Sequence, residues 1–172
     1  SAAFEGCDSL KQSPTIEIKI KKFSYRLLKH NRLAMVTRYS GDTQRVVIPS
    51  EITYEGVSYR VTSIGYSAFR YRNSLKKITI PDSVTSIGDF AFASCDSLTS
   101  VVIPNSVTSI GEHAFEDCRR ITKIKIPDSV TSIGQFAFTH CRCLTKIKIP
   151  NSVKNIELAT FSDCKSLQEV TI

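Results

Sequence analysis

An apolar pattern that repeats every 23 residues constrains this chain more than any other feature of its sequence. The repeated unit reads LxxIxIPxSVTSIGxxAFxxCxx, and its first apolar position recurs at Leu75, Leu98, Ile121, Leu144 and Leu167. A Phe column recurs at the same interval, at Phe69, Phe92, Phe115, Phe138 and Phe161. One such unit is too small to bury its own apolar face, whereas stacked copies share a continuous core. The sequence therefore predicts a solenoid.

Each part of the repeated unit predicts a local structure. Apolar and polar residues alternate in segments such as LTKIKIP, which indicates a short strand that the following proline ends. The β-branched SVTSIG segments indicate second short strands, and segments such as DFAFASC are interpreted as single helical turns. We expect the glycines 65, 88, 111 and 134 to supply a backbone conformation that a Cβ would disfavour. The expected fold is a solenoid of 23-residue repeats with a parallel β-sheet, short second strands and single helical turns.

The repeat closely resembles the leucine-rich repeats of bacterial surface proteins of the BspA, or treponemal, type. The resemblance covers residues 61–172, and the preceding VVIPSEITYEGVSYRVTSIG is similar to the entry segment of such arrays. It implies a leucine-rich repeat solenoid that is secreted or exposed on a bacterial cell surface. It also implies adhesion-type binding of host or microbial surface proteins.

The chain is expected to have three parts. Residues 1–13 read as the tail of a preceding repeat, because Phe4, Cys7 and Leu10 have the spacing of Phe92, Cys95 and Leu98. This match predicts a segment of a longer array, or an array that ends uncapped. Residues 14–60 depart from the period and contain alternating segments such as IEIKI and FSYRLL, which indicates a β-rich N-terminal cap or insertion. Residues 61–172 form the leucine-rich repeat array.

The net charge of +7 comes mainly from the N-terminal part of the chain. Residues 75–172 carry 11 basic and 10 acidic residues, so that part is nearly neutral. A basic cluster in the N-terminal part could contact nucleic acid or an anionic glycan: Lys19, Lys21, Lys22, Arg26, Lys29 and Arg32. Such residues more often form the solvated face of a hairpin, and we do not expect a nucleic-acid partner. No apolar run has the length of about 20 residues that a membrane helix needs.

The cysteines indicate structural thiols and one reactive thiol. Five of the 6 cysteines share one repeat column beside the Phe column, where buried thiols act as small hydrophobic groups. The sharper alternative is a zinc site from His140, Cys141 and Cys143, but a second ligand pair at a typical spacing is missing. We expect no metal site and no cofactor. Cys143 occupies a position that other repeats fill with serine or arginine, so it should be exposed and reactive.

The sequence gives little support for catalysis. It contains no Walker loop, no GxSxG and no HExxH motif, and the 3 histidines are scattered. The many serines belong to the repeated SVTSIG segment, where a turn hydroxyl explains them. A non-catalytic chain is therefore predicted, and a fragment of a carbohydrate-active or nucleic-acid enzyme is the weakest alternative.

Lysines dominate the positions that should point outward from the main sheet. If the LxxIxI frame faces the core, the outward residues include Lys77, Lys123, Lys125, Lys146 and Lys148. Like charges on neighbouring strands oppose stability, so the arrangement needs an explanation. Lysines on exposed strands favour solubility, and they would also attract an anionic ligand.

The predicted function is a secreted or cell-surface protein-binding module. The alternatives are a structural spacer that presents another domain and, more weakly, anionic glycan binding through this lysine face.

Overall fold

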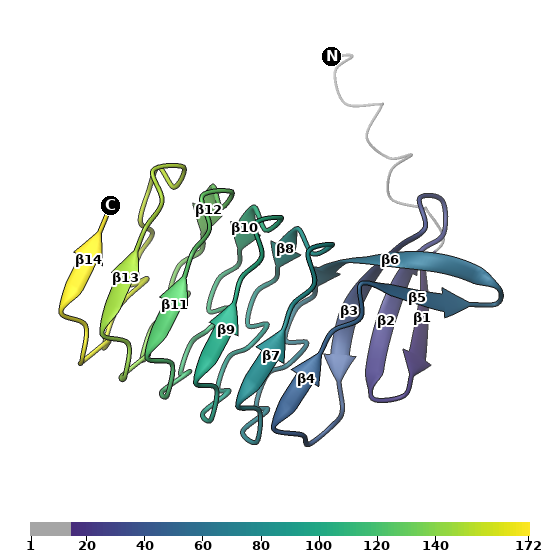
Figure 1. The fold of residues 1–172 in the computed structure, drawn as a ribbon, viewed down its shortest axis with the longest axis horizontal. Helices are drawn as coiled ribbons and strands as arrows, with labels where there is room; N and C mark the ends of the chain where they lie inside the picture. The colour runs from purple at the N-terminus through teal and green to yellow at the C-terminus, as the bar shows by residue number, and fades with distance from the viewer. Residues whose placement is uncertain (1–14) are drawn as a thin grey trace, which may run out of the picture.

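The computed structural model describes residues 15–172 and shows a stack of β-rungs that follow the 23-residue period of the sequence (Figure 1). The N-terminal part contains β1 (Thr15–Ile20), β2 (Phe23–Leu28), β3 (Leu33–Tyr39), β4 (Arg45–Val47), β5 (Glu51–Tyr54) and β6 (Val57–Ile64). The repeats contain β7 (Lys77–Thr79), β8 (Ser86–Ile87), β9 (Ser100–Val102), β10 (Ser109–Ile110), β11 (Lys123–Lys125), β12 (Ser132–Ile133), β13 (Lys146–Lys148) and β14 (Glu169–Thr171). The segment 1–13, interpreted as a repeat tail, lies outside the described residues.

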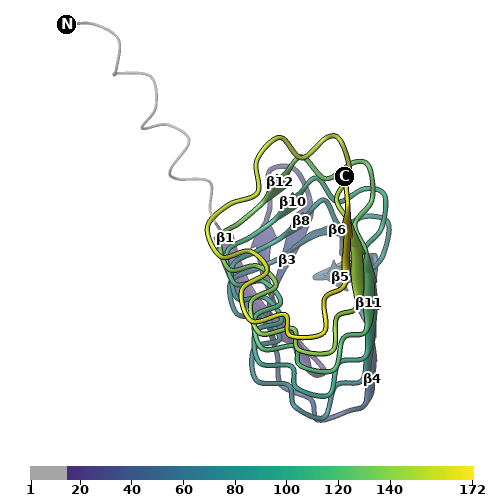
Figure 2. The same ribbon diagram turned by 90° about the vertical axis from the view of Figure 1, so that its left-hand side faces the viewer.

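The strands before the prolines form the predicted parallel sheet. This main sheet has the order β14-β13-β11-β9-β7-β4, and its repeat strands pair with residues 23 positions apart, such as Ile124 with Val101 and Ile147. In β4, β7, β9, β11 and β13 the middle residue is buried and its two neighbours are exposed. Figure 2, which looks along the stack, shows this sheet along one side of the rungs. Its outer face is therefore open to solvent.

A second sheet joins the repeats to the N-terminal part. It contains the short strands β8, β10 and β12, and β6 continues it into β3, β2 and β1, with β5 paired to β6. Gly65 donates its N–H to the Val36 carbonyl oxygen at 2.7 Å, and the Tyr39 ring stacks on Phe69 with a 5.4 Å centroid distance. The β-rich segment thus covers the first rung of the array (Figure 1). The described residues contain no helix that could cross a membrane.

The prediction of single helical turns was wrong. The segment at residues 89–95 is a series of turns in which Phe90 and Ser94 have φ angles of 55° and 57°. A right-handed helix excludes such angles. Phe90, Phe92 and Ser94 donate their N–H groups to carbonyls of the next rung at 2.7 to 2.8 Å. Since alternate N–H groups leave the rung to bond its neighbour, the i to i−4 bonds of a helix cannot form.

The repeated glycines serve close approach of the backbones, not an unusual φ angle. Among the glycines of the described chain only Gly56 has a positive φ. A Cβ on Gly111 would lie 2.6 Å from the Asp89 nitrogen, and one on Gly134 would lie 2.5 Å from the Glu112 nitrogen. Glycine is therefore required because the preceding rung leaves no room for a side chain.

The last rung shows what happens without this glycine. Glu157 takes the glycine position there, and no second strand forms between residues 153 and 157. Gly134 donates its N–H to the Ile110 carbonyl at 2.9 Å, but within residues 15–172 Glu157 makes no equivalent backbone bond to Ile133. Ile156 is then 50% exposed, whereas the equivalent Ile133 is buried. In Figure 2 the olive trace of this rung departs from the rungs behind it.

Stacked phenylalanines run along the core. Neighbouring rings of the column lie 5.2 to 5.7 Å apart with interplanar angles of 3° to 17°. Phe115 is fully buried and stacks on both sides, against Phe92 and Phe138. Phe161 is partly buried and stacks on Phe138 alone among the described residues. The column therefore links each rung to the next through side chains as well as through the backbone.

Phe115→Ala should lower the free energy of unfolding by about 3–5 kcal/mol, because it removes a buried ring and leaves a cavity. Phe161→Ala should cost clearly less and should fray mainly the last rung, since a stack of repeats is stabilised by local units and interfaces. Chemical denaturation and hydrogen exchange of the two variants measure the difference. Equal losses of global stability would contradict a linear array.

Gly134→Ala should destabilise the protein by about 1–3 kcal/mol, because the added methyl group collides with the backbone of the preceding rung. Ser132→Ala is the matched control, since Ser132 is exposed on the neighbouring strand and its loss should change stability by less than about 0.5 kcal/mol. Thermal denaturation of the two variants makes the comparison. If the Gly134→Ala variant were as stable as the control, the close approach of the two backbones would not require glycine at this position.

Candidate interaction face

All five lysines predicted as ligand-binding residues lie on the outer face of the main sheet and are exposed. Lys123 is the cross-strand partner of Lys146, and Lys125 is the partner of Lys148. Lys77 lies in the same row as Lys123, separated from it by Ser100. The structure thus groups four lysines on β11 and β13 and places the fifth two strands away. We call the outward residues of the strands β4, β7, β9, β11 and β13 the lysine face.

One lysine of this face has an acidic partner among the described residues. Lys146 Nζ lies 2.7 Å from a carboxylate oxygen of Glu169 on β14. Their side-chain hydrogen bond and, next, their mutual attraction raise the pKa of Lys146 and lower the pKa of Glu169. Both side chains are exposed, so the pair adds little to stability. Within residues 15–172, Lys77, Lys123, Lys125 and Lys148 form no ion pair, and the face keeps a positive charge.

The lysine face extends further than the sequence analysis placed it. Arg45 and Val47 on β4 are exposed and pair with Lys77 and Thr79, so they continue the two outward rows. The signal was present, because QRVVIP at residues 44–49 matches KKITIP at 76–81. Val47 and Val102 are 68% and 70% exposed. The face therefore combines cationic side chains with two uncovered apolar side chains.

The cysteine column lies in the core. Cys95, Cys118 and Cys141 are buried, Cys164 is partly buried and Cys143 is exposed, all as free thiols. Each column cysteine donates its S–H to a backbone carbonyl of the preceding repeat, at 3.1 to 3.3 Å. Burial raises the pKa of the Cys95 thiol to about 12 and raises the pKa values of Cys118 and Cys141 strongly as well. These thiols therefore stay protonated near neutral pH.

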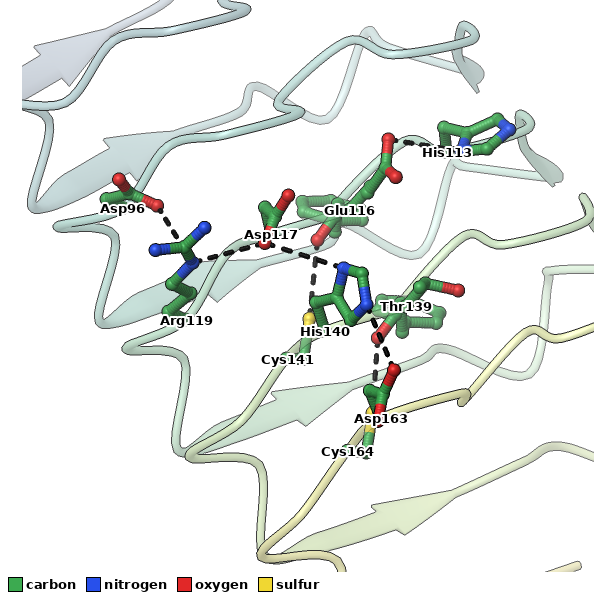
Figure 3. Close-up of polar contacts among 12 residues, drawn as sticks. Asp96, His113, Glu116, Asp117, Arg119, Thr139, His140, Cys141, Asp163 and Cys164 are labelled. Carbon is green, nitrogen blue, oxygen red and sulfur yellow. Dashed lines mark hydrogen bonds and ion pairs between the residues drawn. The ribbon is translucent and has the colours of Figure 1, made fainter.

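The residues of the alternative zinc site do not converge. Cys141 points into the core toward the Phe115 carbonyl, whereas His140 faces Asp117 and Asp163 on the neighbouring turns (Figure 3). Ligand atoms of His140, Glu116 and Asp117 do lie within 4.8 Å of one another. Arg119, however, is 3.1 Å from Asp117 and already supplies a positive charge there.

These groups instead form a chain of polar contacts across the rungs. Arg119 connects Asp96 with Asp117 at 3.7 and 3.1 Å, and His140 connects Asp117 with Asp163 at 3.6 and 3.1 Å (Figure 3). All of these side chains are partly or fully accessible to solvent, so these contacts add little to stability. The chain explains the local charges as contacts between neighbouring turns.

The comparisons with known proteins agree with this architecture. Residues 61–172 match the family described as BspA type leucine rich repeat region, in 6 copies. A leucine rich cell surface protein from Faecalibacterium prausnitzii has 37% identity and a TM-score of 0.82 over 93% of this chain and 43% of its own. The leucine rich repeat protein of T. pallidum has 35% identity and a TM-score of 0.81 over 90% of this chain and 71% of its own. The pneumococcal vaccine antigen PcpA, at 20% identity and a TM-score of 0.71, shares the fold over 93% of this chain and 47% of its own. No curated protein matches the chain.

In the folded protein, a mild thiol reagent at neutral pH should modify Cys143 and leave Cys95, Cys118 and Cys141 unmodified. Cys143 is exposed, whereas the other three thiols are buried and carry raised pKa values. Peptide mass spectrometry after labelling assigns the modified residues, and labelling in denaturant is the control in which all of them react. Modification of the buried thiols at the rate of Cys143, or their recovery as disulfides, would contradict the buried column.

Proposed function

The chain belongs to the BspA-type leucine-rich repeat family, and on this premise we propose that it is a secreted or cell-surface bacterial module that binds proteins through its lysine face. We propose further that the chain acts by binding and catalyses no reaction. Support comes from the family, whose fold presents repeated side chains on a regular surface, and from the surface protein to which the chain is similar. This chain spans 43% of the length of that surface protein. Any activity that requires a complete protein of that length is therefore part of the proposal.

The paired lysines carry the proposal. Lys123 and Lys125 lie directly opposite Lys146 and Lys148, although like charges at cross-strand positions reduce stability. The equivalent positions on β9 hold Ser100 and Val102, so the fold does not require lysine there. Four cations on two adjacent strands, of which only Lys146 pairs with a described carboxylate, create a local positive potential that attracts an acidic surface.

The neighbouring apolar residues favour a protein as the partner. Val102 on β9 is 70% exposed and is the cross-strand partner of Lys125, and Val47 is 68% exposed in the same row. Protein interfaces commonly combine an apolar contact area with polar and charged groups around it. The partner is therefore a host or microbial surface protein with an acidic patch. An anionic glycan would use the same lysines, and a structural spacer would use none of them.

Replacing Lys123, Lys125, Lys146 and Lys148 by the Ser or Thr residues of other repeats should abolish binding of an acidic protein partner. The melting temperature should stay unchanged or rise slightly, because like-charge repulsion is removed. Wild-type binding should weaken as salt rises, since the screening length falls to about 8 Å near 0.15 M. A pull-down of host matrix proteins and sulfated glycans, followed by titration of the captured ligand at several salt concentrations, measures these effects.

The matched control loses the same charge from the exposed surface of the N-terminal β-segment around β1 and β2, which we call the N-terminal hairpin. It neutralises Lys19, Lys21, Lys22 and Lys29. The control should bind as the wild type does. Loss of binding in the control and not in the lysine-face variant would move the site to the hairpin. Capture of sulfated glycans in preference to proteins would favour the glycan alternative, and no capture at all would favour the spacer.

A further inference from the structure

A second cationic surface lies where the N-terminal β-segment meets the first repeat. A cavity of about 340 Å³ opens between β3 and the turn at residues 66–72. Its lining contains three arginines, two tyrosines and a serine: Arg38, Arg70, Arg72, Tyr66, Tyr71 and Ser67. None of the lining residues within 15–172 is acidic. We call it the arginine pocket.

The arginines of the pocket have no ion-pair partner among the residues that the structure describes. Within the described part of the chain, Arg38, Arg70 and Arg72 form no ion pair with any carboxylate. The acidic residue bonded to the pocket rim is Glu17, which accepts a hydrogen bond from Thr37 at 3.1 Å. Glu17 also pairs with Arg26 at 2.7 Å, so its charge is already balanced. Three guanidinium groups around one hollow thus produce a positive potential that no ion pair within residues 15–172 offsets.

The guanidinium group of Arg70 is held in place by aromatic rings. Its Cζ atom lies 4.7 Å from the centre of the Tyr71 ring and 4.8 Å from the centre of the Phe90 ring. Stacking fixes the plane of the group and leaves the N–H donors at its edge free for a ligand. The group is therefore positioned before any ligand arrives.

Two buried polar atoms of pocket residues have no hydrogen-bond partner. They are Nε of Arg70 and Oγ of Ser67, and the described chain contains one further atom of this kind, in Asp96. Buried polar groups in folded proteins are normally hydrogen-bonded, so each exception needs an explanation. Both atoms belong to residues that line the arginine pocket, so two polar groups beside it are left unpaired by residues 15–172.

The residues of the pocket also depart from the repeat. Tyr66, Arg70, Tyr71 and Arg72 stand where the next repeat has Asp89, Ala93, Ser94 and Cys95. The backbone is nevertheless the same, since Tyr71 and Ser94 have φ angles of 61° and 57°. Arg70 and Ala93 likewise bond the carbonyl three residues earlier, at 3.1 and 3.0 Å. The fold therefore does not need these particular side chains at this turn.

We propose that the arginine pocket binds one acidic sugar unit, carboxylated or sulfated, of a glycan. Guanidinium groups bind planar carboxylates and sulfates through paired, charge-assisted hydrogen bonds. Tyr66 and Tyr71 are 65% and 59% exposed, so their rings and hydroxyls are available to a sugar ring and its hydroxyl groups. A volume of about 340 Å³ is at the lower end of small-ligand pockets, which suits one sugar unit better than the edge of a folded protein. The site is separate from the lysine face and does not depend on the function proposed for it.

The test is an NMR titration of the isotope-labelled chain with a hyaluronan disaccharide and with sialyllactose as acidic probes. Lactose serves as the neutral probe and tetraglutamate as an acidic peptide probe. We expect saturable shifts at residues 37–38 and 66–72 with the acidic sugars, and none with lactose. The double variant Arg70→Ala/Tyr71→Ser carries the residues of the next repeat and should bind the acidic sugars at least tenfold more weakly, with an unchanged melting temperature.

Two further variants keep the outcome clear. Arg38→Ala changes an exposed side chain and should weaken binding several-fold even if the double variant folds poorly. The lysine-face variant should keep the wild-type affinity, so failure of the lysine-face proposal does not affect this one. The proposal is overturned if neither acidic sugar binds saturably, if lactose binds equally well, or if tetraglutamate binds the same residues more tightly than the sugars do.

Discussion

Hydrogen bonding between the backbones of neighbouring rungs is the constraint on which the rest of this structure depends. Except in the second sheet of the last rung, each repeat bonds its neighbour in the main sheet, in the second sheet and along the turn segment, as the bonds from Phe90, Phe92 and Ser94 to the next rung show. Burying a rung without these partners would be costly, because backbone polar groups must be paired. The requirement for contact along the whole rung explains Gly111 and Gly134, which leave room for the adjacent backbone. It also explains the positive φ angles of Phe90 and Ser94 in the turn segment.

Because the backbone is fixed by its neighbours, the side chains on the outside are free to differ between repeats. Ser100 and Lys123 occupy equivalent outward positions on strands of the same shape, and Tyr71 and Ser94 occupy equivalent positions on turns with similar φ angles. A departure from the repeat at such a position is a better indicator of binding than the repeated residues are. The lysine face and the arginine pocket are both departures of this kind, and they lie on different parts of the rung.

The N-terminal β-segment contributes residues to both the lysine face and the arginine pocket. β4 extends the main sheet and adds Arg45 to the row of Lys77, while β3 supplies the wall of the arginine pocket opposite Tyr66 and Arg70. The stack of aromatic rings continues across the junction, since Tyr39 lies against Phe69. The segment therefore covers the core of the first rung and at the same time contributes side chains to two candidate binding surfaces.

The sequence by itself determined the period, the parallel sheet, the short second strands and the residues that face the core. These follow from two periodicities, 2 within a strand and 23 between rungs, that a linear pattern displays directly. It also placed Lys123, Lys125, Lys146 and Lys148 on one face, since alternation along a strand decides which side chains point outward. The tertiary structure decided the turn conformation, where bonds to the next rung replaced the expected helical turn. It also decided the role of the glycines, the loss of the last second strand at Glu157 and the arginine pocket. These features depend on contacts between segments that are distant in sequence or do not repeat, and no local pattern records such contacts.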